Sequence, residues 1–176
     1  MKSEYLSSII KHSETYKTLA EKTLERIPED KIKWNYNEVS NSIGVIVKHI
    51  SGNMLSRWTD FLTTDGEKEW RHRDSEFEND IDSRKELMKK WNEGWKCYFK
   101  ALNSLKDEDL TKKILIRNEK HTVEDAINRQ LAHYSYHIGQ IVYLAKMICG
   151  EDWISLSVPK NKSKEYNLEK FAKQRV

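Results

Sequence analysis

The sequence has few cysteines and no long apolar run. Only Cys97 and Cys149 occur in 176 residues, far apart and without CxxC spacing. This pattern excludes a disulfide framework and a thiolate metal motif, and it fits a reducing compartment. No window approaches the roughly 18 apolar residues of a membrane span, and the first residues lack the apolar stretch of a signal peptide. We therefore expect a cytoplasmic protein with no membrane partner.

The sequence has no long block of basic residues and no long block of acidic residues. The 31 Lys and Arg residues and 28 Asp and Glu residues give a net charge of +3, and the two signs alternate along the sequence. No Lys/Arg run is interleaved with aromatic residues, so we expect no nucleic-acid partner. The length suits one domain. We expect a single helical domain over residues 1–176, in which 151–176 form a basic C-terminal extension.

Apolar residues recur with the 3.6-residue period of an amphipathic helix in four stretches. Pro28 should stop the first helix, and Gly150 should stop the last. The second, third and fourth helices are each preceded by a Ser, Thr, Asp or Asn residue that can cap the start of a helix. The four predicted helices run from Tyr5 to Ile27, from Ile43 to Phe61 with Ser40 or Asn41 as cap, from Ser83 to Leu105 with Asp82 or Ser83 as cap, and from Thr122 as cap to Gly150.

The segments between these helices predict how the helices are arranged. Residues 28–41 should form a packed connection anchored by Trp34 and Tyr36. The polar stretch 62–82 has no period and predicts a long crossover, which lets the second and third helices run parallel. Residues 111–123 predict a short β-hairpin that turns at 118–120. The fold class is therefore all-α, a four-helix bundle with a long crossover and a hairpin before the last helix.

Two histidines predict the chemistry. His133 and His137 lie four residues apart in the last helix, so both imidazoles leave the same face. His49 borders the apolar stripe of the second helix, among small residues such as Gly52. Three imidazoles can hold a divalent ion such as zinc or nickel and leave coordination positions open. On spacing alone, satisfied core or surface histidines are a competing interpretation.

The segments His49-Ile-Ser-Gly-Asn-Met-Leu-Ser-Arg-Trp and His133-Tyr-Ser-Tyr-His-Ile-Gly-Gln-Ile resemble the DinB/YfiT-like superfamily of damage-inducible proteins. The resemblance covers nearly the whole chain. It implies a bundle with parallel second and third helices and a divalent ion, nickel or zinc, held by His49, His133 and His137. Some members resemble S-transferases that conjugate bacillithiol, mycothiol or glutathione to an electrophile, whereas others have no known activity.

The resemblance leaves three hypotheses open. A metal-dependent thiol S-transferase would meet a carboxylate of its thiol through Arg57, Arg129 or the tail lysines of 160–164, although solvated basic residues are the simpler interpretation. The alternatives are a non-catalytic bundle that binds metal or dimerises, and a metal-dependent hydrolase. For a hydrolase, the sequence places no obvious carboxylate base next to the histidines. As partners we expect a small-molecule substrate and a second copy of the chain.

Overall fold

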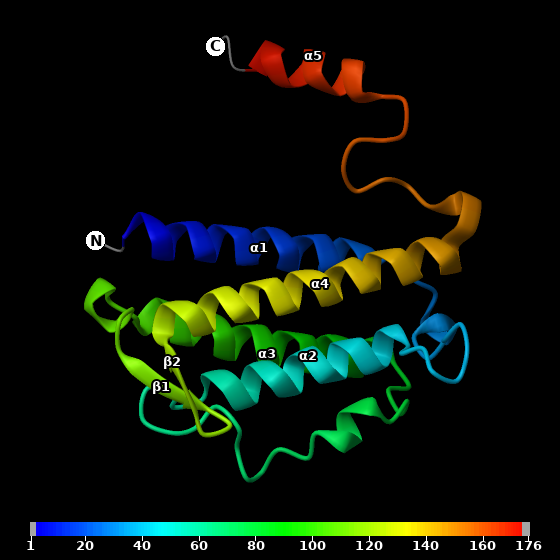
Figure 1. Cartoon of the computed structure of the whole chain (residues 1–176). Coiled ribbons are helices and arrows are strands. Elements are labelled where there is room, and N and C mark those ends of the chain that lie inside the picture. Colours follow the sequence, from blue (N-terminus) through cyan, green and yellow to red (C-terminus); the bar gives the residue numbers. More distant parts are fainter. Residues whose placement is uncertain (1–2, 174–176) are drawn as a thin grey trace.

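The structure, a computed structural model, describes residues 3–173. Four long helices form its body, and a two-stranded antiparallel hairpin precedes the last of them (Figure 1). Four short 3-10 helices and a C-terminal helix complete the described part. The elements are α1 (Glu4–Leu24), η1 (Glu29–Lys31), α2 (Ile43–Trp58), η2 (Asp74–Phe77), α3 (Arg84–Ser104), η3 (Asp107–Asp109), β1 (Lys113–Ile116), β2 (Glu119–Thr122), α4 (Val123–Cys149), η4 (Gly150–Asp152) and α5 (Ser163–Lys173).

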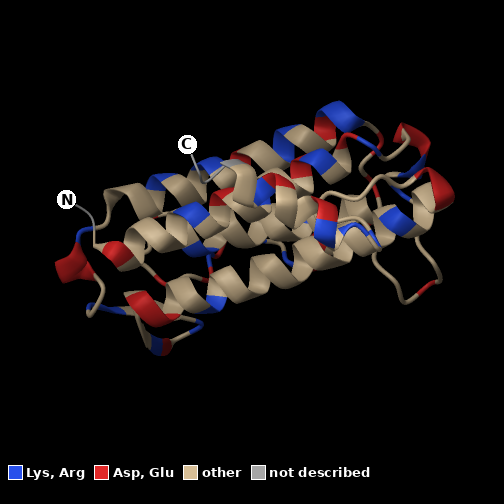
Figure 2. Ribbon diagram, turned by 90° about the horizontal axis from the view of Figure 1, so that it is seen from above, with Lys and Arg blue, Asp and Glu red and all other residues tan. Residues whose placement is uncertain are grey.

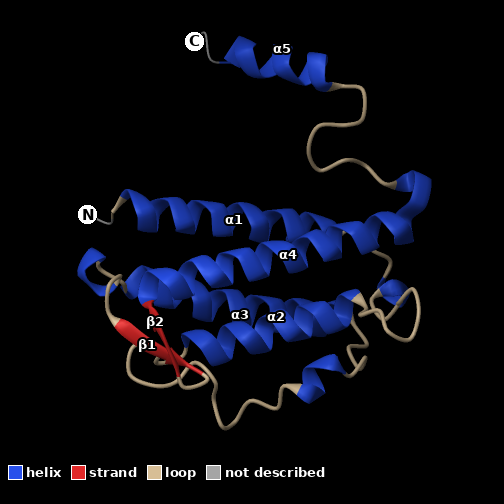
Figure 3. Ribbon diagram, in the orientation of Figure 1, coloured by secondary structure: helices blue, strands red, loops and turns tan. Residues whose placement is uncertain are grey.

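The four long helices follow the order that the loop lengths predict. α1 and α4 run in one direction, whereas α2 and α3 both run in the other (Figure 1). The segment between α2 and α3, residues 59–83, crosses back along the bundle and carries η2. The hairpin lies at the bundle end where α4 begins (Figure 3). The all-α bundle with a parallel pair, a crossover and a hairpin is thus confirmed.

Aromatic side chains fill the centre of the bundle and fix α2 against α4. Trp95, Tyr98 and Tyr134 are fully buried, and the Tyr134 ring packs edge-on against both neighbours. Trp58 Nε1 donates a hydrogen bond to Tyr134 Oη (3.0 Å), which donates to Asn53 Oδ1 (3.1 Å). Rings buried in this way contribute roughly 1.5–3 kcal/mol each. The hydrogen bonds set the register of α4 on α2 one residue from His133.

Small residues let neighbouring backbones approach α2. A Cβ on Gly94 of α3 would lie 2.9 Å from Ser51 Cα, so this glycine allows the two parallel helices to touch. A Cβ on Gly52 would lie 2.3 Å from Glu76 Oε1 in the crossover. Such distances are impossible for real side chains without displacement. The small residues of α2 thus admit the backbone of α3 at Ser51 and a carboxylate at Gly52.

The predicted caps are partly confirmed. Ser83 accepts from Glu86 N (3.2 Å), Thr122 accepts from Asp125 N (3.0 Å), and Gly150 ends α4 with φ 55°. The cap of α2 is Ser42, which accepts from Val45 N (3.2 Å), so the prediction of Ser40 or Asn41 is wrong. Several neighbouring polar residues can cap a helix, and only the backbone path selects one.

Three predicted details of the connections differ from the structure. α1 ends at Leu24 and α2 at Trp58, each three residues early. The backbone turns away after α2 at extended Thr59 and at Asp60 (φ 46°), and the apolar pattern continues because Ile27 and Phe61 are buried from the turns that follow the helices. The hairpin turns at Arg117 and Asn118, whose φ angles of 53° and 63° suit a two-residue turn. Tyr36 is 69% exposed and anchors nothing.

The C-terminal extension leaves the bundle. α5 lies apart from the four long helices, and the side chains of residues 163–172 are exposed (Figure 1). On the helices of the bundle, basic and acidic residues alternate without forming a block of one sign (Figure 2), as the sequence predicts. Within residues 3–173, no helix combines the length and the apolar character that crossing a membrane requires.

Candidate metal centre

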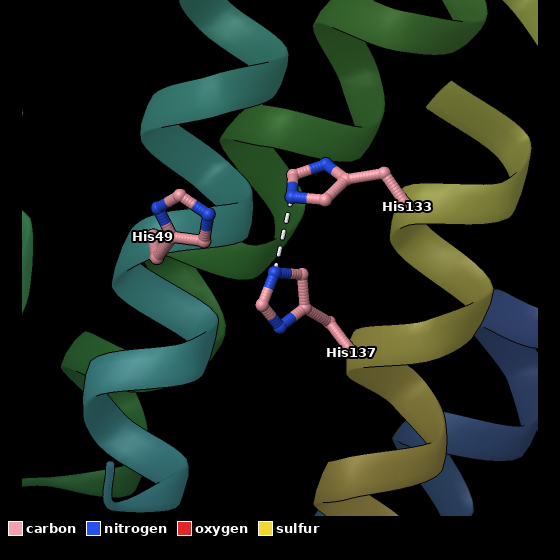
Figure 4. A group of neighbouring side chains, drawn as sticks. All are labelled: His49, His133 and His137. Carbon is pink, nitrogen blue, oxygen red and sulfur yellow. Dashed lines mark hydrogen bonds between the residues drawn. The ribbon is translucent and has the colours of Figure 1, made fainter. Parts of the chain in front are cut away.

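Three imidazoles meet between α2 and α4 (Figure 4). His49 comes from α2, and His133 and His137 come from successive turns of α4. His49 and His137 are 7% and 6% exposed, and their ring centroids are 5.0 Å apart. His133 Nε2 lies 3.0 Å from His137 Nε2, and one nitrogen of each ring lies within 4.8 Å of the others. The predicted convergence of the three side chains is confirmed.

Two of the three rings are oriented by hydrogen bonds from Nδ1. His49 Nδ1 donates to Glu76 Oε2 (2.9 Å), and His137 Nδ1 donates to Gln140 Oε1 (2.8 Å). Arg71 in turn holds Glu76 through Nε to Oε1 (2.7 Å) and Nη2 to Oε2 (3.0 Å). A carboxylate or amide oxygen only accepts, so each Nδ1 carries the proton and each Nε2 keeps its lone pair. Both lone pairs are thus available to an ion.

His133 has less support than the other two rings. Its Nδ1 is buried and has no hydrogen-bond partner within residues 3–173. Burial lowers its pKa to about 3, with a further contribution from the charges that His137 and His49 would carry. Burial likewise lowers the pKa of His137 to about 4. Both imidazoles are therefore neutral near pH 7, which is the form that binds a metal.

The donor set fits a divalent transition metal. Two nitrogens that share an ion at about 2.0–2.1 Å lie roughly 3 Å apart, and His133 Nε2 and His137 Nε2 are already 3.0 Å apart. Three neutral nitrogens without a carboxylate favour zinc, nickel or a related ion over magnesium or calcium. Three protein ligands also leave positions for water or substrate, as in catalytic zinc sites.

A cavity of about 200 Å³ opens beside His49 and His133. Both arginines predicted to bind the cofactor line it, whereas the tail lysines of 160–164 do not. Arg57 is not a solvated surface residue. It is 6% exposed and donates to the Gly66 carbonyl and to Glu67 Oε2 (3.1 and 3.2 Å). Arg129 is exposed, and it forms no ion pair in the described part of the chain.

The crossover supplies site residues that sequence reasoning missed. Glu76 and Arg71 orient His49, and the Phe77 ring lies 5.1 Å from the His49 ring between centroids. Nothing in the sequence singles out Glu76 among the 28 acidic residues. The available signals were the length of the crossover and Gly52, one turn after His49, whose lack of a side chain makes room for the carboxylate.

Comparisons with known proteins agree with this fold. A crystal structure of a conserved protein from Enterococcus faecalis superimposes with a TM-score of 0.64 at 17% identity, covering 86% of this chain and 99% of that one. At this identity the likeness shows the fold alone. A search of curated proteins found no match. The family model described as "Protein of unknown function (DUF1572)" matches residues 1–162, and the chain belongs to that family.

Proposed function

We propose that this chain is a divalent-metal-dependent enzyme of the DinB/YfiT-like type that transfers a low-molecular-weight thiol to an electrophile. His49, His133 and His137 would hold the ion, with zinc or nickel suited to three nitrogen ligands. The observation that carries the proposal is that the three imidazoles converge without a fourth His, Cys, Asp or Glu ligand among the described residues, and that two of them line a cavity. A purely structural site would be closed by a fourth protein ligand.

A bound ion would supply Lewis-acid chemistry, which lowers the pKa of a coordinated thiol. The chain's own residues orient the ligands and surround the reactants. Glu76 and Gln140 fix two imidazoles, and Phe77 and Tyr136 place aromatic rings beside them, with Tyr136 4.2 Å from His137 between centroids. In the transfer, the sulfur electron pair forms the new S–C bond. The leaving group departs with the pair of the broken bond, and the thiol proton passes to water.

Glu76 favours thiol transfer over hydrolysis. A metal-dependent hydrolase needs a carboxylate that can accept a proton from water. Arg71 and His49 occupy both oxygens of Glu76. Burial opposes its charge, but hydrogen bonds from His49 and Arg71 prevail and lower the pKa of its carboxyl below the ordinary value. Glu76 is therefore a positioning residue and a poor base.

The first test is the metal content of the purified chain. We expect close to one divalent ion per chain by elemental analysis, and loss of that ion in His137→Ala because two nitrogens remain from three. His12→Ala, which removes an exposed histidine of α1, is the matched control and should keep the metal. Stoichiometric metal in His137→Ala would refute the assignment of the ligands.

Turnover is tested separately from metal binding. Metal-loaded protein should consume bacillithiol, mycothiol or glutathione with a fluorogenic alkyl halide, and His137→Ala should lose the activity. If the chain binds metal but turns over none of these thiols, the non-catalytic metal-binding bundle is the better description.

A further inference from the structure

Five arginines from four parts of the chain line the cavity beside the histidines. Arg57 lies on α2, Arg71 and Arg73 on the crossover, Arg117 at the hairpin turn and Arg129 on α4. We call this group the arginine pocket. None of the described residues that line it is acidic. Side chains of one sign from separate segments meet here, whereas basic and acidic residues alternate along the helices of the bundle (Figure 2).

One carboxylate, Glu67, lies within 3.5 Å of three of the arginines. Glu67 Oε2 accepts from Arg57 Nη1 (3.1 Å) and Arg117 Nε (3.0 Å), and it lies 3.5 Å from Arg71 Nη1. Arg71 also pairs with Glu76. Asp65, a third carboxylate nearby, accepts from backbone N–H groups of the hairpin turn and the crossover instead. The guanidinium groups therefore outnumber the carboxylates that face them.

The two remaining arginines have no carboxylate at all. Arg73 and Arg129 are exposed, and neither forms an ion pair within residues 3–173. The Arg73 guanidinium lies over the Phe77 ring, 4.9 Å from its centroid, and Arg73 lines the same cavity as His49. Arg129 is four residues before His133 on the same helix, one turn away. Both residues therefore line the cavity with guanidinium groups that no carboxylate in the described part of the chain neutralises.

One buried donor in the pocket also has no partner. Arg57 Nε forms no hydrogen bond within the described residues, and Arg57 is 6% exposed. Gln130 Oε1 is also buried without a partner among these residues, but it is an acceptor and needs a donor, which an anion does not supply. Burial lowers the pKa of Arg57, and repulsion from Arg71 and Arg117 contributes, but the guanidinium stays charged. A buried donor without an acceptor is costly, and an anion in the pocket would relieve both the repulsion and this unmet donor.

We propose that the arginine pocket binds an anionic group of the substrate, a carboxylate or a phosphate, while the histidines hold the ion beside the reacting atom. Guanidinium forks bind both kinds of oxyanion through paired N–H···O bonds. A cavity of about 200 Å³ takes one end of a small molecule and not the whole of it. The proposal rests on the proposed function, because it names the substrate class of the same site.

Calorimetric titration of the metal-loaded full chain tests the pocket, with inorganic phosphate and succinate as separate probes. We expect one probe to bind, and the probe that binds tells a phosphorylated substrate from a carboxylate one. Arg73→Gln and Arg129→Gln should each weaken that binding about tenfold or more, with the metal content unchanged. Arg129→Lys, which keeps the charge but loses the fork, should fall between Arg129→Gln and the native chain.

Lys89→Gln is the matched control, because it removes one positive charge from an exposed position on α3. Its binding should equal that of the native chain. Undiminished binding in the Arg73→Gln/Arg129→Gln double variant overturns the pocket, and so does stoichiometric metal with no binding of either probe. If the chain binds no metal but binds a probe through Arg129, the proposed function fails and the pocket stands.

Discussion

The histidine site and the arginine pocket share one cavity but are built differently. The three imidazoles stand on two adjacent helices, and two of them are one turn apart. The five arginines come from two helices, the crossover and the hairpin turn. A metal site tolerates little positional error, so its ligands sit on rigid elements. Recognition of an anion by several guanidinium groups allows more tolerance, and loops can supply them.

The two regions also differ in charge. Burial keeps His133 and His137 neutral near pH 7, whereas burial of Arg57 does not remove its charge. The histidines thus offer lone pairs and the arginines offer N–H donors. Glu76 and Arg71 link the two groups, because Glu76 accepts hydrogen bonds from both His49 and Arg71. Substitutions at Glu76, or at Gly52 beside it, should therefore alter the histidine site most directly.

Glu76→Gln should have the largest effect among changes that leave the ligands intact. The amide keeps an acceptor near His49 Nδ1 but loses the charge that fixes the ring and pairs with Arg71. We expect metal affinity to fall about 10- to 100-fold, measured by competition with a chelator of known affinity. Glu93→Gln, an exposed carboxylate on α3, is the control. Equal affinities for the two variants would show that Glu76 does not position His49.

Gly52→Ala tests the same contact without altering a charge. Its Cβ would lie 2.3 Å from Glu76 Oε1 and 2.7 Å from Cδ, so the carboxylate must move. We expect metal affinity to fall about tenfold, at the lower end of the effect of losing a group that supports a ligand.

Gly139→Ala on α4 is the matched control, because nothing lies within 4 Å of the added carbon. It should leave metal affinity unchanged and raise the free energy of unfolding by up to about 1 kcal/mol, the helix preference of alanine over glycine. Urea unfolding of both variants measures this difference. An equal gain in Gly52→Ala, with native metal affinity, would mean that Glu76 yields to the added methyl without consequence.

The smallest expected effect is the pH dependence of the metal-free chain. His133 and His137 have an ordinary pKa of 6.5, lowered on folding to about 3 and about 4. Below pH 6.5 the two histidines take up protons in the unfolded chain but not in the folded chain. The free energy of unfolding should therefore decline as the pH falls from about 6.5 towards 4. Urea midpoints measure this decline. The His133→Gln/His137→Gln variant should show a shallower slope, and an identical slope would contradict the burial of neutral rings.

The sequence predicts the histidine site better than the pocket. His133 and His137 are local in the sequence, and their spacing alone places both rings on one face. His49 could be joined to them because it borders an apolar stripe and because the family resemblance includes it. The bundle and its parallel pair followed from apolar periodicity and loop length. These signals are local, so they can be recognised in the sequence without knowledge of the tertiary structure.

The arginines and Glu76 carry no such local signal. Arg71, Arg73 and Glu76 lie in a polar stretch without period, where any charged residue suits a solvated loop equally well. Arg57 has the appearance of a surface residue at the end of a helix, yet Gly66 and Glu67 of the crossover cover it. Only the path of the crossover decides which of its charges face the cavity, and that path depends on long-range packing.

The crossover helps to determine the charge of the cavity, whereas the helices determine the position of the three imidazoles. It contributes none of the three histidines, yet it supplies Arg71, Arg73 and Glu76, which set the orientation of His49 and the charge of the cavity. Phe61 and Ile81 near its two ends belong to the common core of the bundle, whereas the polar residues between them do not. Exchange of the polar residues between Phe61 and Ile81, with Glu76 retained, should therefore change the charge of the cavity and leave the three imidazoles in place.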